Sequence, residues 1–184
     1  GILSSGKFRP SSPKRDDRRP SPAKEIQPKF KLSAADQQAL KATPWALKGM
    51  IATLKTQTIP SLKQRTIQLE KSKLRHQEVV NNIYNIKKTD EIRLKVKNST
   101  ITTLKQELLL DAYPTPEARE AAEKKLTTLK ADYNSLLSIY EENDKTLGLA
   151  ENGLMAIEKD IASTTNAWIM AEEEQKAYEM LLKE

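Results

Sequence analysis

Apolar residues recur with one unbroken period through the C-terminal part of the chain, and this pattern constrains the fold most strongly. Counting from Ala122 in alternating steps of four and three reaches eighteen positions up to Leu182, and fifteen of them are apolar or aromatic. A period of 3.5 residues is typical of an α-helix that packs along a second helix in a left-handed coiled coil. A turn within this segment would reset the phase, so the sequence predicts one continuous helix.

The residues on this stripe are the predicted contacts between helices. The predicted seam consists of Leu126, Leu129, Tyr133, Leu136, Tyr140, Leu147, Leu154, Ile157, Ile161, Trp168, Tyr178 and Leu182. Gly148 and Gly153 lie within the same segment. Each glycine costs about 1 kcal/mol relative to alanine inside a helix. We therefore expect the least stable part of this helix near the two glycines.

A first helical arm is predicted from Pro44 to Asp111. Thr43 is suited to cap this helix, because proline is favoured at the position that follows a cap. Apolar residues recur at spacings of three and four along the arm, although their phase drifts. Pro60 lacks the backbone N–H that a helix interior needs, so we expect a kink or an interruption there.

The stretch DAYPTPEA, residues 111–118, separates the two arms. Residues 44–111 and residues 117–184 have equal lengths of sixty-eight residues, and residues 112–116 suit a tight connection between helices. Residues 33–112 carry fourteen Lys and Arg against seven Asp and Glu, whereas residues 113–184 carry eight against fifteen. Equal length and opposite charge predict an all-α fold, a long antiparallel helical hairpin.

Two consequences of this pairing are open to test. In a symmetric hairpin, residue i lies opposite residue 228 minus i, so Trp168 is expected across from Pro60. Pairing of the same arms between two chains would satisfy the charges equally well. The sequence therefore leaves a homo-oligomer as an alternative to the intramolecular hairpin.

Residues 1–32 form a predicted extended arm, rich in Pro, Ser, Lys and Arg and without helical or strand periodicity. A short helix is predicted over residues 33–43, with Ser33 as its cap and Asp36 three residues later. Nine basic residues of the arm are the candidate contacts for an anionic partner. They are Lys7, Arg9, Lys14, Arg15, Arg18, Arg19, Lys24, Lys29 and Lys31.

A flexible basic segment attracts phosphate backbones or acidic protein surfaces over long distances. Nucleic acid and an acidic protein surface are therefore both open as partners of the arm, and a simple docking extension is the plainer alternative. Ser12 and Ser21 each precede a proline, with a basic residue two positions after that proline. This pattern suits proline-directed kinases, so both serines are candidate phosphorylation sites that would reduce the local positive charge.

Several classes of function are disfavoured. The chain has no cysteine and one histidine, His76, without a carboxylate four residues later, so no metal site is expected. No phosphate-binding glycine loop, nucleophile elbow or catalytic triad pattern occurs. We expect no enzymatic activity and no cofactor. No apolar run approaches the roughly 20 residues that span a bilayer, and the expected location is the cytoplasm, the nucleus or a virion.

The predicted function is that of a structural subunit in a larger assembly, a coiled-coil strut or interaction platform with protein partners and a basic docking arm. A second hypothesis is a proteolytically matured viral or phage virion protein that contacts nucleic acid or the capsid shell. It comes from Leu182-Lys183-Glu184, because this ending matches the Leu-x-Glu pattern after which head-processing proteases of tailed phages cut. A third hypothesis is a nucleic-acid-binding regulator that acts through the tail.

Overall fold

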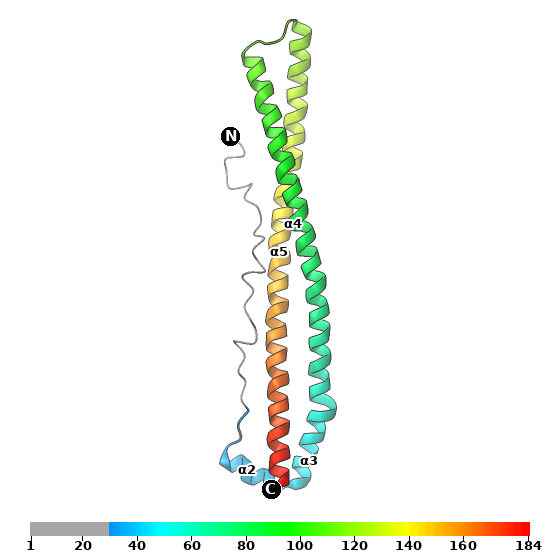
Figure 1. The fold of residues 1–184 in the computed structure, drawn as a ribbon, viewed down its shortest axis with the longest axis vertical. Helices are drawn as coiled ribbons and strands as arrows, with labels where there is room; N and C mark the ends of the chain where they lie inside the picture. The colour runs from blue at the N-terminus through cyan, green and yellow to red at the C-terminus, as the bar shows by residue number, and fades with distance from the viewer. Residues whose placement is uncertain (1–29) are drawn as a thin grey trace. The chain divides into compact units, whose positions relative to one another are not determined.

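The computed structural model describes residues 30–184, which form an all-α helical hairpin (Figure 1). The predicted fold class is confirmed. Within the described residues the chain contains no strand. The helical elements are α2 (Ala34–Lys41), α3 (Pro44–Thr53), the π-helical turn η4 (Leu54–Thr58), α4 (Ile59–Leu109) and α5 (Pro116–Lys183).

The described chain divides into two compact units, each built from parts of both long helices. One unit, here called the turn unit, comprises Glu78–Asn152 and includes the connection between α4 and α5. The other, the terminal unit, comprises residues 30–77 together with Gly153–Glu184. Each unit buries its own apolar core.

The core of the turn unit joins one face of α4 to one face of α5. Its buried members are Leu94 and Ile101 from α4 and Tyr133, Leu136 and Tyr140 from α5. Leu126, Leu129 and Leu137 are partly buried against them. Bulky aromatic and aliphatic side chains at a 3.5-residue spacing therefore close this part of the hairpin.

The core of the terminal unit has more contributors, because the short N-terminal elements also pack there. Its buried members are Leu47, Leu54, Ile59, Ala171, Tyr178 and Leu181. Phe30, Leu32 and Leu40 are partly buried against this core, so the segment before α2 and α2 itself are held by the same apolar cluster. In Figure 1, α2 and α3 lie beside the C-terminal end of α5.

The start of α2 agrees with the prediction and the start of α3 differs from it. Ser33 caps α2, and its hydroxyl accepts a hydrogen bond from the Asp36 backbone N–H at 3.1 Å. Thr43 makes no such cap for α3. Its hydroxyl instead donates to the Ala39 carbonyl at 3.1 Å, because α2 ends so close by that this carbonyl is within reach. Pro44 does occupy the first turn of α3, as predicted.

The predicted irregularity at Pro60 appears as a π-helical turn just before it. The Ile59 backbone N–H bonds to the Leu54 carbonyl, five residues back, across η4. Proline inside an α-helix removes one donor and presses its ring against the carbonyl four residues earlier. The wider π turn relieves this conflict within Leu54–Thr58. The chain then continues as α4 without a break at the proline itself.

The first arm ends in a Schellman-type motif. The Ala112 N–H bonds to the Glu107 carbonyl at 3.1 Å, and the Asp111 N–H bonds to the Leu108 carbonyl at 3.3 Å. Asp111 has a φ of 52°, in the left-handed region that this motif requires at that position. The helix ends at Leu109, two residues before the predicted Asp111, because the residues that form the motif leave the helical conformation.

The second arm begins one residue before the predicted Glu117. The Thr115 hydroxyl accepts a hydrogen bond from the Ala118 N–H at 3.1 Å, and Pro116 takes the first helical position. The threonine–proline pair thus caps α5, although sequence reasoning assigned this role to the equivalent pair at Thr43.

Most of the predicted seam lies at the buried face of α5. Seven members are buried, namely Tyr133, Leu136, Tyr140, Leu147, Leu154, Ile161 and Tyr178. Leu126, Leu129, Ile157 and Trp168 are partly buried. The prediction was wrong at Leu182, which is 38% exposed, whereas its neighbour Leu181 is buried. The reason is that the end of α5 packs into the core that contains Leu47 of α3, which rotates the buried face by one residue.

The predicted register holds to within one helical turn. In the terminal unit, Trp168 faces Lys63 rather than Pro60, with the ammonium 5.6 Å from the ring centroid. Lys73 lies 3.8 Å from the Glu158 carboxylate, whereas the symmetric rule would have placed Glu70 there. The observed register is therefore shifted by three residues from the symmetric one. The shift pairs Glu158 with Lys73 and avoids placing it opposite Glu70. Side-chain packing and charge, rather than the midpoint of the loop, determine the register.

Replacing Gly148 by alanine is expected to raise the free energy of unfolding by about 0.5–1 kcal/mol, because glycine is the poorest helix former after proline. A Cβ at Gly148 would meet no atom within 4 Å outside its own turns of helix, so the added methyl group has room. Urea denaturation followed by circular dichroism measures the change. The matched control is Ala150→Gly, which should lower stability by a similar amount. An unchanged or lower stability for Gly148→Ala would contradict the expectation.

Candidate interaction surfaces

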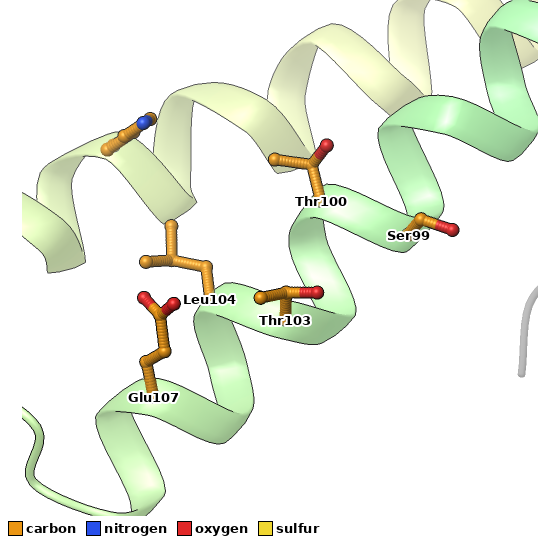
Figure 2. Close-up of a pocket in the computed structure, with 6 residues that line it drawn as sticks. Ser99, Thr100, Thr103, Leu104 and Glu107 are labelled. Atoms are coloured by element: carbon orange, nitrogen blue, oxygen red, sulfur yellow. The ribbon is translucent and has the colours of Figure 1, made fainter.

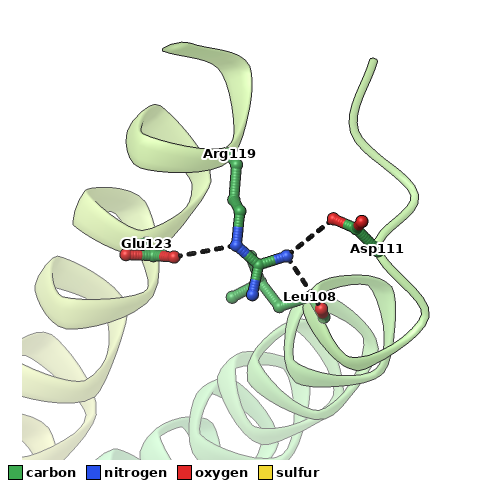
Figure 3. A network of polar contacts seen from close by, with 4 residues as sticks. All are labelled: Leu108, Asp111, Arg119 and Glu123. Atoms are coloured by element: carbon green, nitrogen blue, oxygen red, sulfur yellow. Dashed lines mark hydrogen bonds and ion pairs between the residues drawn. The ribbon is translucent and has the colours of Figure 1, made fainter. Parts of the chain in front are cut away.

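The connection between α4 and α5 is held by Arg119 (Figure 3). Its Nη1 donates to the Leu108 carbonyl at 3.1 Å and to Asp111 Oδ1 at 2.9 Å, while its Nε donates to Glu123 Oε1 at 3.1 Å. One guanidinium therefore joins the first turns of α5 to the Leu108 carbonyl at the end of α4 and to the side chain of Asp111, the residue with left-handed backbone geometry. The planar fork of arginine suits such a divided contact better than a lysine would.

A charged group is buried in the middle of the turn unit. The Lys87 side chain is only 2% exposed, and its ammonium pairs with the Asp144 carboxylate from α5. The same ammonium lies 5.1 Å from the centroid of the Tyr140 ring. Asp90 and Glu91 are also buried nearby on α4. A buried ammonium needs close anionic partners, so this pair favours one alignment of the two helices over others.

Burial, together with the negative charges of Glu91 and Asp144, raises the pKa of the Tyr140 hydroxyl to about 12. Ionising this phenol would place a third negative charge beside two carboxylates. The site therefore keeps Tyr140 neutral over the whole physiological range.

A shallow hollow of about 310 Å³ in the turn unit is lined mainly by α4, with one residue from α5 (Figure 2). Its lining consists of Ser99, Thr100, Thr103, Leu104, Glu107 and Lys125. In Figure 2, Leu104 points toward the facing helix and Ser99 points away from it. The lining side chains are mostly short and carry three hydroxyl groups, with one cation and one anion. The hollow has room for a side chain of a partner, but its lining presents no assembled catalytic group.

The end of the basic arm is attached to the core of the terminal unit. The Phe30 backbone N–H donates to Glu173 Oε1 at 2.7 Å. The Phe30 ring meets the Tyr178 ring edge-on, with centroids 5.8 Å apart and planes at 83°. The Tyr178 hydroxyl in turn donates to Glu174 Oε2 at 2.8 Å. Glu173 and Tyr178 of α5 thus hold Phe30, and Glu174 holds the Tyr178 hydroxyl.

Burial, together with the hydrogen bond to Glu174, raises the pKa of Tyr178 to about 12. The hydroxyl can donate this bond only while it is protonated. The hydrogen bond between Tyr178 and Glu174 therefore depends on a neutral Tyr178.

Most of the residues predicted to bind an anionic partner lie outside the described part of the chain. These are Lys7, Arg9, Lys14, Arg15, Arg18, Arg19, Lys24 and Lys29, together with Ser12 and Ser21. Lys31 is described and is exposed, next to the attached Phe30. These assignments stay predictions.

His76 is exposed, and its Nδ1 lies 2.9 Å from the Ser72 carbonyl one turn earlier on α4. Among residues 30–184, no three or more His, Cys, Asp or Glu side chains are grouped so that they could hold a metal ion. The helices of this described part include none that is both long and apolar enough to cross a membrane.

No protein-family model, curated protein or solved structure matches this chain. Its function is therefore inferred from the described geometry and from the distribution of charge along the sequence.

Sequence reasoning missed the pairing of the buried Lys87 ammonium with the exposed Asp144 carboxylate, and the contact of Phe30 with Glu173. One signal for the first was present, because Lys87 lies seven residues before Leu94 and therefore on the same heptad position of α4. No signal pointed to the second contact, since Phe30 and Glu173 are 143 residues apart. Only the fold brings such residues together.

Substitutions at the Lys87–Asp144 pair should have unequal effects. Asp144→Ala removes the carboxylate that faces the buried Lys87 ammonium, so we expect a loss of about 1.5–3 kcal/mol in the free energy of unfolding. Lys87→Met keeps a similar volume without the charge, and adding it to Asp144→Ala should restore much of the loss. Urea denaturation of the single and double variants measures this. Purely additive losses would show that burial of the ammonium is unimportant.

Two tyrosines should respond differently to removal of the hydroxyl. The Tyr133 hydroxyl is buried and has no hydrogen-bond partner among the described residues, so Tyr133→Phe should leave stability unchanged or raise it. Tyr178→Phe loses the bond to Glu174 and should lower the free energy of unfolding by about 1 kcal/mol at pH 7.

The pH dependence of stability tests the Tyr178 hydrogen bond further. The Tyr178 pKa lies above the unfolded value of 10.0, so its contribution is complete below pH 10 and is lost as the pH rises toward about 12. Denaturant titrations between pH 8 and pH 11 should show a smaller alkaline decline for Tyr178→Phe than for the unmodified chain. An equal decline in both would contradict the assignment.

Proposed function

We propose that the chain is a non-enzymatic structural subunit, a coiled-coil hairpin that serves as an interaction platform and uses its basic N-terminal arm to dock on an anionic partner. The attachment of Phe30 carries this proposal. A backbone hydrogen bond to Glu173 and a ring contact with Tyr178 join the arm to the core of the terminal unit. The arm is thus tethered to a packed body at a defined point.

The charge distribution supports the choice of partner. Residues 1–32 contain nine Lys and Arg against three Asp and Glu, whereas the charges of residues 33–112 and of residues 113–184 cancel. A tethered cationic segment binds anionic surfaces through phosphate or carboxylate contacts with release of counterions. Nucleic acid is the partner class that the test addresses first, and an acidic protein is the alternative.

Deletion of residues 1–29 tests this function while keeping Phe30 and its contacts. The deletion removes eight Lys and Arg and should leave helical content and the melting temperature nearly unchanged, because no described core residue is lost. Binding to mixed-sequence duplex DNA, measured by fluorescence anisotropy across a salt series, should be abolished. For the full chain, log affinity should fall linearly with log salt, at about 0.9 per phosphate contacted.

Charge reversal at Arg18 and Arg19 provides a finer test. The double variant should weaken binding to all DNA sequences alike, because a flexible arm contacts the backbone rather than base edges. Lys124→Glu with Lys125→Glu is the matched control, since it makes the same charge change at exposed residues of α5. Equal effects of the two pairs would reduce the role of the arm to net charge.

A polyglutamate probe in the same assay distinguishes the partner classes. Tight, arm-dependent binding of polyglutamate but not of DNA would assign the arm to an acidic protein surface. If the truncated chain binds both probes as well as the full chain at every salt concentration, the arm is only a spacer and the docking function is wrong.

A further inference from the structure

α4 carries a second stripe, on the side opposite its buried face in the turn unit. Its positions are offset by two residues from the buried ones, as Ile92 is from Leu94, and two residues of an α-helix correspond to about 200°. Every member is exposed and uncharged, and the spacing alternates between three and four. The outward stripe consists of Thr89, Ile92, Val96, Ser99, Thr103 and Gln106.

The outward stripe is uncharged along its length and contains an exposed apolar pair. Ile92 and Val96, one turn apart, are 62% and 61% exposed. The remaining members are small or uncharged polar residues in a helix that is otherwise rich in charge. A heptad-spaced face of this kind is what a third helix packs against in a coiled coil.

The edges of the outward stripe are positively charged and ordered. The Arg93 guanidinium lies 3.4 Å from Asp90 Oδ1, and the Lys95 ammonium lies 3.5 Å from Glu91 Oε1. The two acids are almost buried, at 8% and 11% exposed, whereas both cations are 59% exposed. The acids therefore orient the cations and leave them available at the surface.

Lys88 adds a third cation at the edge of the stripe, with its ammonium 5.8 Å from the centroid of the Tyr84 ring. The hollow of Figure 2 adjoins the other end of the stripe, since Ser99 and Thr103 belong to both, and Lys125 contributes a fourth cation there. The stripe is thus an uncharged surface with four cations beside it, and Glu107 contributes one acid in the hollow at its end.

This charge pattern decides against a second copy of the same stripe as the occupant. An antiparallel pairing centred between Ile92 and Val96 would place Lys95 of one copy opposite Arg93 of the other. A parallel pairing would place each cation beside its own counterpart. Like charges facing across a helix pair are destabilising.

We propose that the outward stripe of α4 is a docking surface for an acidic amphipathic helix of a partner protein. Aliphatic side chains of that helix pack on Ile92 and Val96, and its flanking carboxylates pair with Lys88, Arg93 and Lys95. The surface lies wholly in the turn unit and involves no residue of the basic arm. The two proposals therefore succeed or fail separately.

The probe for this surface is a synthetic, covalently cross-linked helix of about three heptads. It carries isoleucine at position a, leucine at position d and glutamate at positions e and g, and the mutual repulsion of its glutamates keeps it monomeric. A matched peptide has lysine at e and g. The full chain should bind the acidic peptide at least about tenfold more tightly than the basic one, with an affinity that falls as salt is added.

Substitutions locate the binding site. Ile92→Glu and Val96→Glu should each weaken binding of the acidic peptide about tenfold or more, because they place a carboxylate at the centre of the apolar contact. Ile139→Glu is the matched control on α5, where Ile139 is 53% exposed, and it should leave binding unchanged. Circular dichroism melting of each variant verifies that the hairpin is intact, as expected for exposed positions.

Three outcomes would overturn the proposal. The first is equal binding of the acidic and basic peptides. The second is a loss of affinity that is the same for Ile92→Glu and for the control at Ile139. The third is a dimer of the full chain, seen by sedimentation equilibrium, that Val96→Glu dissociates, since a second copy would then occupy the stripe.

Discussion

Burial of one face of α5 against α4 is the interaction on which the rest of the structure depends. Charged residues make up 30% of the chain, which leaves too few apolar residues for a central globular core. The stability of the hairpin therefore comes from a narrow stripe of apolar contacts. Tyr133 and Tyr140 are almost fully buried on this stripe in the turn unit, and Tyr178 is buried in the terminal unit. Large aromatic side chains compensate for the few apolar residues available, because each buries much more surface than an aliphatic residue.

Apolar stripes pack in several registers, and polar contacts select among them. In the turn unit the buried Lys87 ammonium meets Asp144, and a slip by one turn would leave it away from that carboxylate. Arg119 binds the Leu108 carbonyl and Asp111 at the connection between the helices. We infer that these contacts contribute less to total stability than the apolar seam does, but more to the choice of a single alignment.

The two proposed functional features use different physical principles. The arm depends on long-range attraction between net charges and needs order only where it is attached, at Phe30. The outward stripe depends on a defined arrangement of Ile92 and Val96 between oriented cations, and therefore requires a rigid helix beneath it. Asp90 and Glu91 connect the interior of the turn unit with its surface, because both acids are buried and each pairs with an exposed cation, Arg93 or Lys95.

The sequence by itself determined the helical class, the hairpin, the cap at Ser33 and most of the seam, because periodicity and capping are local properties of the chain. It also located the irregularity near Pro60, though not its π-helical form. Tertiary structure decided the exposure of Leu182, the contact of Trp168 with Lys63, the pairing of the buried Lys87 with Asp144, and the attachment of Phe30 to Glu173. These depend on contacts between residues far apart in the chain, where packing and charge across helices outweigh any local preference.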